Sequence, residues 1–538
     1  MEIDRQLVIV ELERLLASSS FRTRKLIKRF LCYAVQETLD GRGDQLNQYT
    51  IAVNALGKPE DFSPVYNPVV RIEAGRLRKL LEEYYAASPQ GSTCIISMPR
   101  GSYQVEFVPH SDTQQSNSII TESFTSRVTE GPRLFAHFQM PDGAGHNDIA
   151  PVLYKLRGDL LLALSRFRNI RLVSSASLET RQTLTQDFLQ QIRHIYRADY
   201  LLNCDIHPRA EADGGGITLR YTVAHTQTDE IIWTDQIILS TQPGQDEVDK
   251  MCRWLIANAV SLHSGTILRH WAEYQLAQHA SLPASQQALI HYIIFLRDIS
   301  YDSFKRALDA CRQRLRAFPD DTKALVIMAR LCGYDHTLQY NLIRNLEEEW
   351  TQAARMAMKL DPGNAEAHSV FAHNSYYRED YTLCIAELET ARQANPYDTA
   401  CEFLYGLGFC LVGDWDKGIN VIQQIMDIPF NQPAWYHVPP FLFAFNRQDY
   451  AEALVHAERI QDFGYWGDMA RTVTLYRMGR HDRALAALQQ LLKNSPSLLK
   501  ADTQPDQRKL SSHPSLAAVW VTIDELRTLM IAHAAKHA

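Results

Sequence analysis

Long hydrophobic runs are absent from this sequence of 538 residues. No stretch of about 20 residues is apolar and uncharged enough to cross a membrane. The first residues include Glu2 and Asp4, and no apolar core of a signal peptide follows them. We therefore expect a cytoplasmic protein that makes no contact with a membrane.

Cysteine is sparse, and the nine cysteines include no Cys-x-x-Cys pair. Most of them fall within apolar segments, where a free cysteine behaves as a small buried hydrophobic residue. An odd number of scattered cysteines predicts neither a disulfide framework nor a zinc site. The pattern is typical of a protein in a reducing cytoplasm.

Common catalytic motifs are missing as well. The sequence has no Gly-x-Ser-x-Gly elbow, no phosphate-binding Gly-x-x-x-x-Gly-Lys-Ser/Thr loop and no His-Glu-x-x-His helix. His533 and His537 have the spacing of two metal ligands on one helix face, but a frayed chain end is the simpler interpretation. We predict no catalytic residue, no metal and no cofactor, and hence a protein that is not an enzyme.

The composition is that of an ordinary globular protein, with 46% hydrophobic and 22% charged residues. The net charge is −7, but residues 1–110 carry 14 Lys and Arg against 13 Asp and Glu, so the acidic excess lies in the remainder. An acidic body disfavours non-specific adhesion to nucleic acid and leaves such binding to a local patch. The length predicts several domains.

Residues 68–107 contain a basic amphipathic helix, a short Pro/Gly break and two strand-like segments. At 100° per residue, one side of the helix is apolar and predicted to pack, while the other side is cationic. The packing side consists of Val70, Ala74, Leu77, Leu80, Leu81 and Tyr84. The opposite side consists of Arg71, Ile72, Gly75, Arg76 and Lys79.

A polar stretch without periodicity at residues 110–131 is typical of a linker. Beyond it, strand-like and helical patterns alternate up to residue 245 and predict an α/β domain. Its last three strand-like segments are joined by 213–216 and 226–229, which have the composition of hairpin turns. The glycines at 214–216 precede a strand and not a helix, so we interpret them as a turn and not as a phosphate cradle.

From residue 246 to 538 the sequence is helical, and prolines mark a repeat. Pro396 follows Pro362 by 34 residues and precedes Pro429 by 33, which is the tetratricopeptide period. Such helix pairs cannot bury their faces alone and stack into a solenoid. The aromatic pairs at 376–377, 435–436 and 465–466 either pack between helices or bind a peptide, and the sequence does not distinguish these roles.

The N-terminal segment resembles the OmpR/PhoB-type winged helix that also heads CadC-like and HilA-like regulators. The resemblance lies in residues 76–80 of the basic helix and in residues 96–103 of the ribbon, where Gly101-Ser102-Tyr103 departs slightly from the family's Gly-Tyr pair. Residues 132–242 resemble a TolB-like α/β domain, mainly through 198–202 and 228–235. This domain order is similar to that of bacterial transcriptional regulators.

The winged-helix resemblance implies that the third helix enters the major groove and the wing touches the minor groove. In that position Ile72 can meet a thymine methyl, and Arg76 can reach a base edge or a phosphate. Arg71, Arg78 and Lys79 would contact phosphates, and Arg100 would enter the minor groove. Glu73 on the same helix opposes this assignment unless it pairs with an arginine or a cytosine.

We therefore predict a multidomain chain. It consists of an N-terminal winged helix-turn-helix domain (1–109), a linker (110–131), a TolB-like α/β domain (132–245) and an all-α tetratricopeptide solenoid (246–538). The predicted function is sequence-specific regulation of transcription through double-stranded DNA. The repeat region would contact a protein or peptide partner or mediate self-association, and operator symmetry suggests a homodimer. The alternative is a tetratricopeptide adaptor whose winged helix contacts protein and not DNA.

Overall fold

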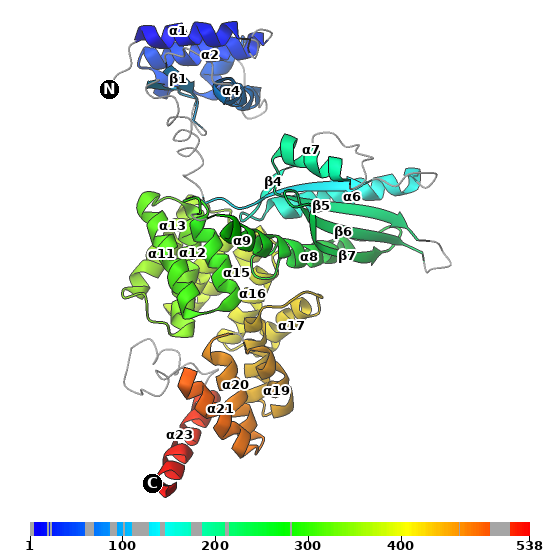
Figure 1. Ribbon diagram of the computed structural model, residues 1–538, viewed down its shortest axis with the longest axis vertical. Helices are drawn as coiled ribbons and strands as arrows, with labels where there is room; N and C mark the ends of the chain where they lie inside the picture. Colours follow the sequence, from blue (N-terminus) through cyan, green and yellow to red (C-terminus); the bar gives the residue numbers. More distant parts are fainter. Residues whose placement is uncertain are drawn as a thin grey trace. The chain divides into compact units, whose positions relative to one another are not determined.

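The computed structural model divides the chain into two units, residues 1–125 and 126–538, which are described separately (Figure 1). It describes residues 5–18, 21, 24–59, 69–86, 94–99, 103–109, 129–139, 146–173, 185–209, 215–279, 282–461, 463–494 and 517–537, although not every side chain among them. None of the helices in these ranges combines the length and the apolar composition that crossing a membrane requires.

The N-terminal unit is a small helical bundle with a two-stranded antiparallel ribbon. Its elements are α1 (Arg5–Ala17), α2 (Lys25–Leu39), η1 (Gly43–Gln45), α3 (Gln48–Asn54), α4 (Val69–Ala86), β1 (Cys94–Ser97) and β2 (Glu106–Pro109). In the ribbon, Ile95 pairs with Val108 and Ile96 with Phe107. The sequence interpretation did not include α1, because its apolar residues surround the helix: Leu7 and Val10 remain 42% and 40% exposed.

Helix α4 packs with the face that its sequence predicts. The apolar stripe meets α2, α3 and β1 in one hydrophobic core, which includes Phe30, Ile51 and Ile96. All six predicted packing residues are buried: Val70, Ala74, Leu77, Leu80, Leu81 and Tyr84. The helix and the ribbon predicted for residues 68–107 are therefore observed, and the ribbon lies against the bundle.

The second unit begins with a five-stranded sheet of order β4-β3-β5-β6-β7. The elements are β3 (Arg133–Gln139), α6 (His146–Ser165), β4 (Arg171–Val173), α7 (Gln186–Tyr196), β5 (Tyr200–Pro208), β6 (Ile217–His225) and β7 (Glu230–Leu239). Strand β3 runs parallel to β4 and β5, and β5, β6 and β7 form an antiparallel meander. The alternation of strands and helices that the sequence predicts for this region is therefore observed in its described residues.

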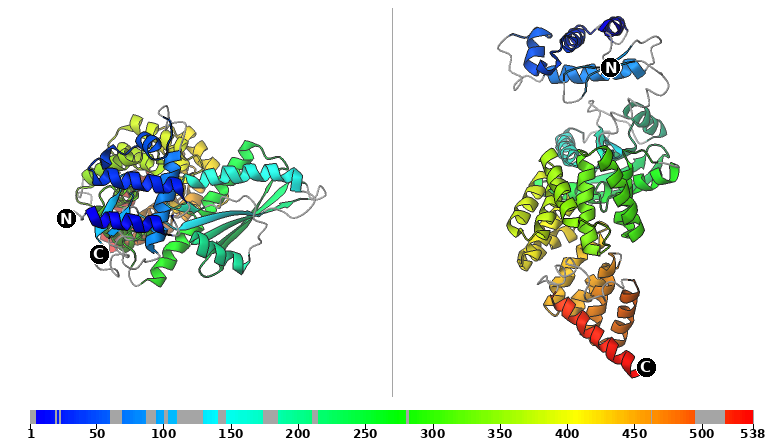
Figure 2. Two further views of the ribbon diagram at one scale, coloured as in Figure 1. Left: turned by 90° about the horizontal axis from the view of Figure 1, so that it is seen from above. Right: turned by 90° about the vertical axis from the view of Figure 1, so that its left-hand side faces the viewer.

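Alternating side chains bury both faces of this sheet. Leu134 and Leu202 point to the face that α6 and α8 cover, and α6 runs along the strands (Figure 2). Phe135 and Leu201 point to the other face, where Phe188 of α7 packs on them. A hydrophobic layer on each side is the arrangement expected for parallel strands.

Tight turns join the strands of the meander, as the sequence predicts. Gly215 and Gly216 have φ angles of +65° and +97°, which glycine adopts without strain. A Cβ on Gly216 would lie 2.4 Å from the carbonyl oxygen of Leu239, so the strand could not approach so closely. Asp229, at the second turn, also has a positive φ of 56°. The glycine run thus serves as a turn in its described part.

Helices make up the remainder of this unit. They are α8 (Gln245–Ala259), α9 (Thr266–Gln278), α10 (Gln287–Asp298), α11 (Tyr301–Ala317), α12 (Thr322–Leu338), α13 (Leu346–Leu360), α14 (Ala365–Tyr377), α15 (Tyr381–Ala394), α16 (Thr399–Leu411), α17 (Trp415–Met426), η3 (Ala434–His437), α18 (Val438–Asn446), α19 (Tyr450–Arg459), α20 (Tyr465–Arg477), α21 (His481–Asn494) and α23 (Ala517–His537). Helices α8 and α9 contact β7, so the sheet and the helical array share one core.

From α10 to α21 the helices form antiparallel pairs that stack in chain order, which confirms the predicted helical repeat region. The first helices of successive pairs contact each other, as α10, α12, α14 and α16 do. Pro362, Pro396 and Pro429 each lie just beyond the end of a second helix. The segment between Pro362 and Pro396 forms the pair α14 and α15.

Candidate functional site

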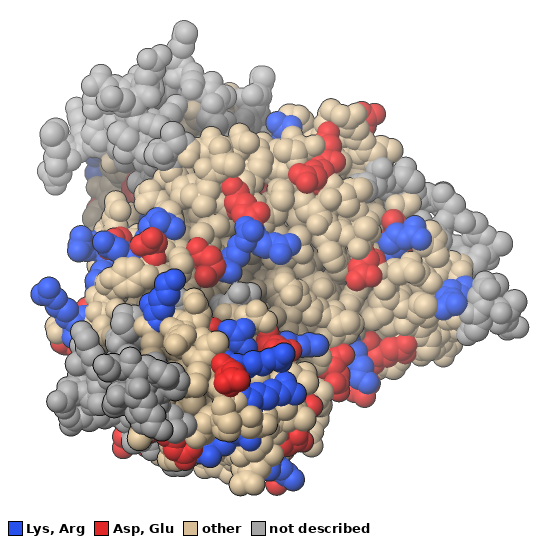
Figure 3. Space-filling view, turned by 60° about the horizontal axis from the view of Figure 1, so that its bottom comes forward, with Lys and Arg blue, Asp and Glu red and all other residues tan. Residues whose placement is uncertain are grey.

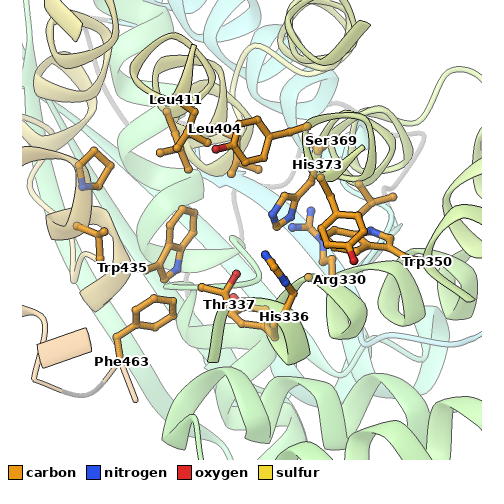
Figure 4. Close-up of a pocket in the computed structure, with 18 of the residues that line it drawn as sticks. Arg330, His336, Thr337, Trp350, Ser369, His373, Leu404, Leu411, Trp435 and Phe463 are labelled. Carbon is orange, nitrogen blue, oxygen red and sulfur yellow. The ribbon is translucent and has the colours of Figure 1, made fainter. Parts of the chain in front are cut away.

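A cavity of about 260 Å³ lies inside the helical array. Its lining comes from α12, α14, α16, α18 and α20, together with single residues of α13, α15 and η3 and the connection between α8 and α9, where His263 lies. Residues more than 100 positions apart in the sequence therefore meet around one space (Figure 4). The concave side of a helical solenoid is the surface where such convergence is expected.

Aromatic rings form most of the wall. Trp350 of α13 is fully buried and contacts the rings of His373 and Tyr377 at centroid distances of 4.9 and 5.1 Å. Trp435 and Phe463 lie on the opposite side of the cavity (Figure 4). The surface offered to a ligand is thus largely apolar, as in most small-molecule sites.

Polar groups gather at one side of the cavity, where Arg330, His336 and His373 approach one another (Figure 4). The Arg330 side chain is only 11% exposed, and its nearest carboxylate is Glu366, with Nη2 3.9 Å from Oε2. Glu366 in turn accepts a hydrogen bond of 2.6 Å from Nδ2 of Asn169, which follows α6. The carboxylate nearest to the Arg330 guanidinium is therefore beyond hydrogen-bond distance and already accepts a hydrogen bond from Asn169.

Two donors at the cavity lack an acceptor within the described part of the chain. These are Nε of Arg330 and the indole Nε1 of Trp350, and both atoms are buried. The polar tip of Trp466 differs, because its Nε1 donates to the carbonyl oxygen of Thr337 at 3.2 Å. A buried donor without a partner is unfavourable by roughly 1–3 kcal/mol. These two donors are therefore available to a ligand that accepts hydrogen bonds.

Burial lowers the pKa of two cavity histidines, His263 and His373, so that both are neutral at pH 7. Desolvation and the positive charge of Arg330 lower the pKa of His263 to about 3. Desolvation, His336 and Arg330 lower the pKa of His373 to about 4. Burial also raises the pKa of Glu366, although Arg330 opposes this effect. The site thus carries one firm positive charge, that of Arg330, and a carboxylate whose ionised form is disfavoured.

The residues that the sequence assigns to DNA lie in the N-terminal unit. Arg76 on α4 is 60% exposed, and its Nη1 lies 2.5 Å from Oε1 of the buried Glu73. Glu73 would repel a DNA phosphate if it were unpaired. In the structure it forms an ion pair with Arg76, which lies one helical turn further along α4. This pair also means that Arg76 must exchange one partner for another if it contacts a nucleic acid.

Arg78 has a structural contact. Its Nε and Nη2 donate to the carbonyl oxygens of Met98 and Pro99 at 3.0 and 3.1 Å, so it joins α4 to the ribbon. Arg71, Ile72 and Lys79 lie on α4, but their side chains are outside the described residues, as is Arg100 altogether. The side chains of His533 and His537 fall outside them too.

The structure shows which rings of the three aromatic pairs line the cavity and which pack between helices. Tyr376, Tyr377, Trp435 and Trp466 line the cavity. Tyr436 instead stacks on Phe403 at a centroid distance of 3.9 Å and is buried. Each sequence pair thus contributes at least one ring to the cavity wall.

Sequence reasoning missed Arg330, Trp350 and His373. One signal was present: Arg330 follows six apolar residues of α12 (324–329) that are all buried. A single arginine within so apolar a helix is unusual, because a buried charge needs a partner or a ligand. Within the described residues, no group of three or more His, Cys, Asp or Glu side chains is placed to hold a metal ion.

Comparison with protein-family models and with curated protein sequences finds no match. Several solved structures are similar. A tetratricopeptide protein of Thermus thermophilus shares 16% identity over 37% of this chain and 99% of that one, with a TM-score of 0.27. The type IV pilus biogenesis factor PilW shares 12% identity over 42% of this chain and 98% of that one, with a TM-score of 0.28. PilF of Pseudomonas aeruginosa shares 13% identity over 43% of this chain and 98% of that one, with a TM-score of 0.27. Values this low say nothing about what the chain binds, so its function must be inferred from its own geometry.

Proposed function

We propose that this chain is an adaptor protein that holds a partner polypeptide on its helical array. The observation that supports this proposal is an open groove of about 850 Å³ on α13, separate from the cavity described above. Glu347 and Glu348 line one end of the groove, where Arg378 at the end of the neighbouring α14 also lies, and Arg355 and Lys359 line the other end. Such a surface is complementary to a segment with a basic end and an acidic end.

Apolar contact is available in the same groove. Met356, which is 37% exposed, lies within the basic end, between Arg355 and Lys359. From Glu347 to Lys359 the helix rises about 18 Å, which matches five or six residues of an extended peptide. Around the array, acidic and basic side chains alternate over the face that Figure 3 shows, so no field of one sign covers it. Partner choice would then depend on the local order of charges.

A photo-crosslinking amino acid at Gln352, inside the groove, tests this proposal in cells. We expect a reproducible set of crosslinked proteins that is lost when Met356→Glu and Lys359→Glu are combined, because the variant reverses one charge and removes the apolar contact. Lys305→Glu, an exposed position on α11, is the matched control and should leave the set unchanged. Equal crosslinking in both variants, or none in any, would count against the adaptor.

A second candidate function is sequence-specific binding of duplex DNA by the N-terminal unit, as in bacterial transcriptional regulators. The supporting observation is the exposed Arg76 on a helix that Arg78 ties to a ribbon. In this interpretation α4 enters the major groove, and Arg71, Ile72 and Lys79 complete its contact surface. The ribbon would bring Arg100 to the minor groove.

Fluorescence anisotropy of the full chain with a random duplex separates the two functions. A DNA-binding protein should lose affinity steeply between about 50 and 200 mM salt, because counterions are released from the phosphates. Arg76→Ala combined with Lys79→Ala should abolish a sequence-specific gel shift while the circular dichroism spectrum stays the same. Absence of salt-dependent binding would leave the adaptor as the sole function.

A further inference from the structure

The cavity of the helical array is distinct from the groove on α13 and differs from it in size and chemistry. Its volume of about 260 Å³ exceeds many times the ~10–15 Å³ that one water molecule needs, yet lies just below the range of ~300–1,000 Å³ typical of drug-sized ligands. We propose that this cavity binds a small apolar carboxylic acid, with its carboxylate on Arg330 and its apolar body between the aromatic side chains.

The charge of Arg330 determines the polar end of the ligand. The guanidinium is nearly buried, and the 3.9 Å between its Nη2 and Glu366 is too long for a hydrogen bond. Glu366 is also engaged by Asn169. A planar carboxylate matches the forked geometry of a guanidinium and forms short, charge-assisted hydrogen bonds with it. An anion in the cavity would thus give Arg330 the close partner that the described residues do not supply.

The hydrogen-bond balance of the cavity favours the same ligand. Nε of Arg330 and Nε1 of Trp350 are donors without acceptors among the described side chains and backbone groups. An ionised carboxylate offers only acceptors, about four lone-pair sites on two oxygens. Because the adjacent His373 is neutral at pH 7, it can donate one further N–H without adding charge. An amine at this end would add donors beside two donors that have no acceptor, and an amide would bring no negative charge to pair with Arg330.

The opposite side of the cavity determines the body of the ligand. Trp435 and Phe463 face the polar cluster across the cavity, and Leu404 and Leu411 lie beside them (Figure 4). Burying an apolar ring against such walls yields about 25 cal/mol per Å². The combination of one anionic group and an aromatic or alkyl body describes a small organic acid better than it describes a sugar or a nucleotide.

Calorimetric titration of the full chain with 3-phenylpropionate tests this inference. Its matched neutral probe is 3-phenylpropanamide, which has the same body and no charge. We expect the acid to bind and the amide to bind about 10- to 100-fold more weakly, since a hydrogen bond to a charged group is worth about 1.5–3 kcal/mol. Arg330→Gln should remove this preference, and Arg330→Lys should restore part of it.

Two further variants separate a specific loss from a folding defect. Leu411→Trp adds bulk on the side of the cavity away from Arg330 and should weaken the acid and the amide equally. Arg316→Gln, an exposed arginine of α11, should leave the binding of both probes unchanged. Circular dichroism and thermal unfolding of each variant check that the array remains folded.

The inference is overturned if acid and amide bind equally, if Arg330→Gln and Leu411→Trp both leave binding unchanged, or if the acid gives no heat at millimolar concentration. A peptide with a free C-terminal phenylalanine supplies the same chemistry from a chain end. Tighter binding of this peptide than of the free acid, lost on amidation, would also reject a small-molecule ligand. Crosslinking at Gln352 reports on the adaptor groove separately, so either proposal can fail alone.

Discussion

Asp321 shows how single residues join distant parts of the second unit. Its carboxylate accepts hydrogen bonds of 2.7 Å from Nε of Arg314 and 2.7 Å from Oγ1 of Thr129, and a third from the backbone N–H of Ala324. The side chains of Asp321 and Arg314 are 0% and 2% exposed. A buried charge is tolerated only with this degree of compensation. One aspartate thus caps α12, compensates the charge of Arg314 on α11 and accepts a hydrogen bond from Thr129 in the segment that leads into β3.

Replacing Asp321 with alanine should be strongly destabilising. The variant leaves Arg314 as an uncompensated buried charge, and breaking such a pair decreases the free energy of unfolding by about 3–5 kcal/mol. Asp320→Ala is the matched control, because Asp320 is exposed, and it should change stability by less than about 0.5 kcal/mol. Urea unfolding followed by tryptophan fluorescence measures both. A small effect at Asp321 would show that Arg314 finds another partner.

A pair of buried histidines makes stability depend on pH. Nδ1 of His437 lies 3.1 Å from Nδ1 of His456, and Nε2 of His456 lies 3.2 Å from Glu452. Desolvation, followed by the charges of His456 and Arg459, lowers the pKa of His437 to about 4. Desolvation also lowers the pKa of His456, although Glu452 opposes this effect. Only one imidazole of the pair can donate across the short contact.

We expect the second unit to lose stability as the pH falls from 6.5 towards 4. In this window the unfolded chain takes up a proton at residue 437 and the folded chain does not, so the free energy of unfolding decreases, by up to about 3 kcal/mol. His437→Gln should reduce the loss between pH 7 and pH 5 in urea unfolding. His279→Gln, at an exposed position, should not. Identical pH profiles for wild type and His437→Gln would contradict the assignment.

At the scale of elements, the repeat depends on one recurring turn. The second residue before the second helix has a positive φ in three successive pairs: 64° at Glu379, 99° at Gly413 and 65° at Gln448. The aspartate that follows each of them caps the next helix with its side chain, as Asp414 does. These turns set a tight antiparallel approach, because the chain reverses within a few residues.

Helices α16 and α17 approach most closely at two glycines. A Cβ on Gly418 would lie 2.6 Å from the carbonyl oxygen of Gly406 and 2.5 Å from Sγ of Cys410. Gly418→Ala should therefore push the helices apart and destabilise the array by about 1–3 kcal/mol, although alanine is the better helix former. Gly158→Ala, within helix α6 of the same unit, meets no atom within 4 Å and serves as the control. Thermal unfolding of both variants distinguishes crowding from helix propensity.

At the scale of the whole molecule, the sheet region attaches to the repeat turns. Nη1 of Arg166 donates to the carbonyl oxygen of Ala394, next to Pro396, and Nε of Arg253 donates to Pro396 itself at 3.1 Å. Nδ2 of Asn258 donates to the carbonyl oxygen of Pro429. Backbone carbonyl oxygens at or near these prolines thus accept hydrogen bonds from the sheet region and α8. This arrangement explains why residues 126–538 behave as one unit.

The N-terminal unit should fold without the remainder of the chain. Its hydrophobic core, from Val8 to Val105, is formed entirely by its own side chains. Residues 1–125, produced alone, should show a helical circular dichroism spectrum and a cooperative thermal transition. Spectra of 1–125 and 126–538 should add up to that of the full chain. A non-cooperative melt of the isolated segment would show that it requires the second unit.

Local sequence patterns are sufficient to locate most elements of this protein. Six apolar positions at helical spacing define the buried face of α4, and prolines 33 or 34 residues apart define the repeats. Helix amphipathicity, caps and prolines act over a few residues, so they can be recognised without the fold. Helix α1 escaped recognition because its apolar residues are not confined to one face.

Only the tertiary structure decided which side chains meet. Arg330, His373 and Trp466 belong to three different helix pairs, and the sequence contains nothing that places them around one cavity. The sequence assigns Arg78 to a DNA phosphate because it is a basic residue on α4. In the structure it donates instead to the ribbon, because the fold brings two carbonyl oxygens within its reach. Helix periodicity is a property of neighbouring residues, whereas a cavity depends on how successive pairs stack. The sequence therefore determined the helices, and their stacking determined the site.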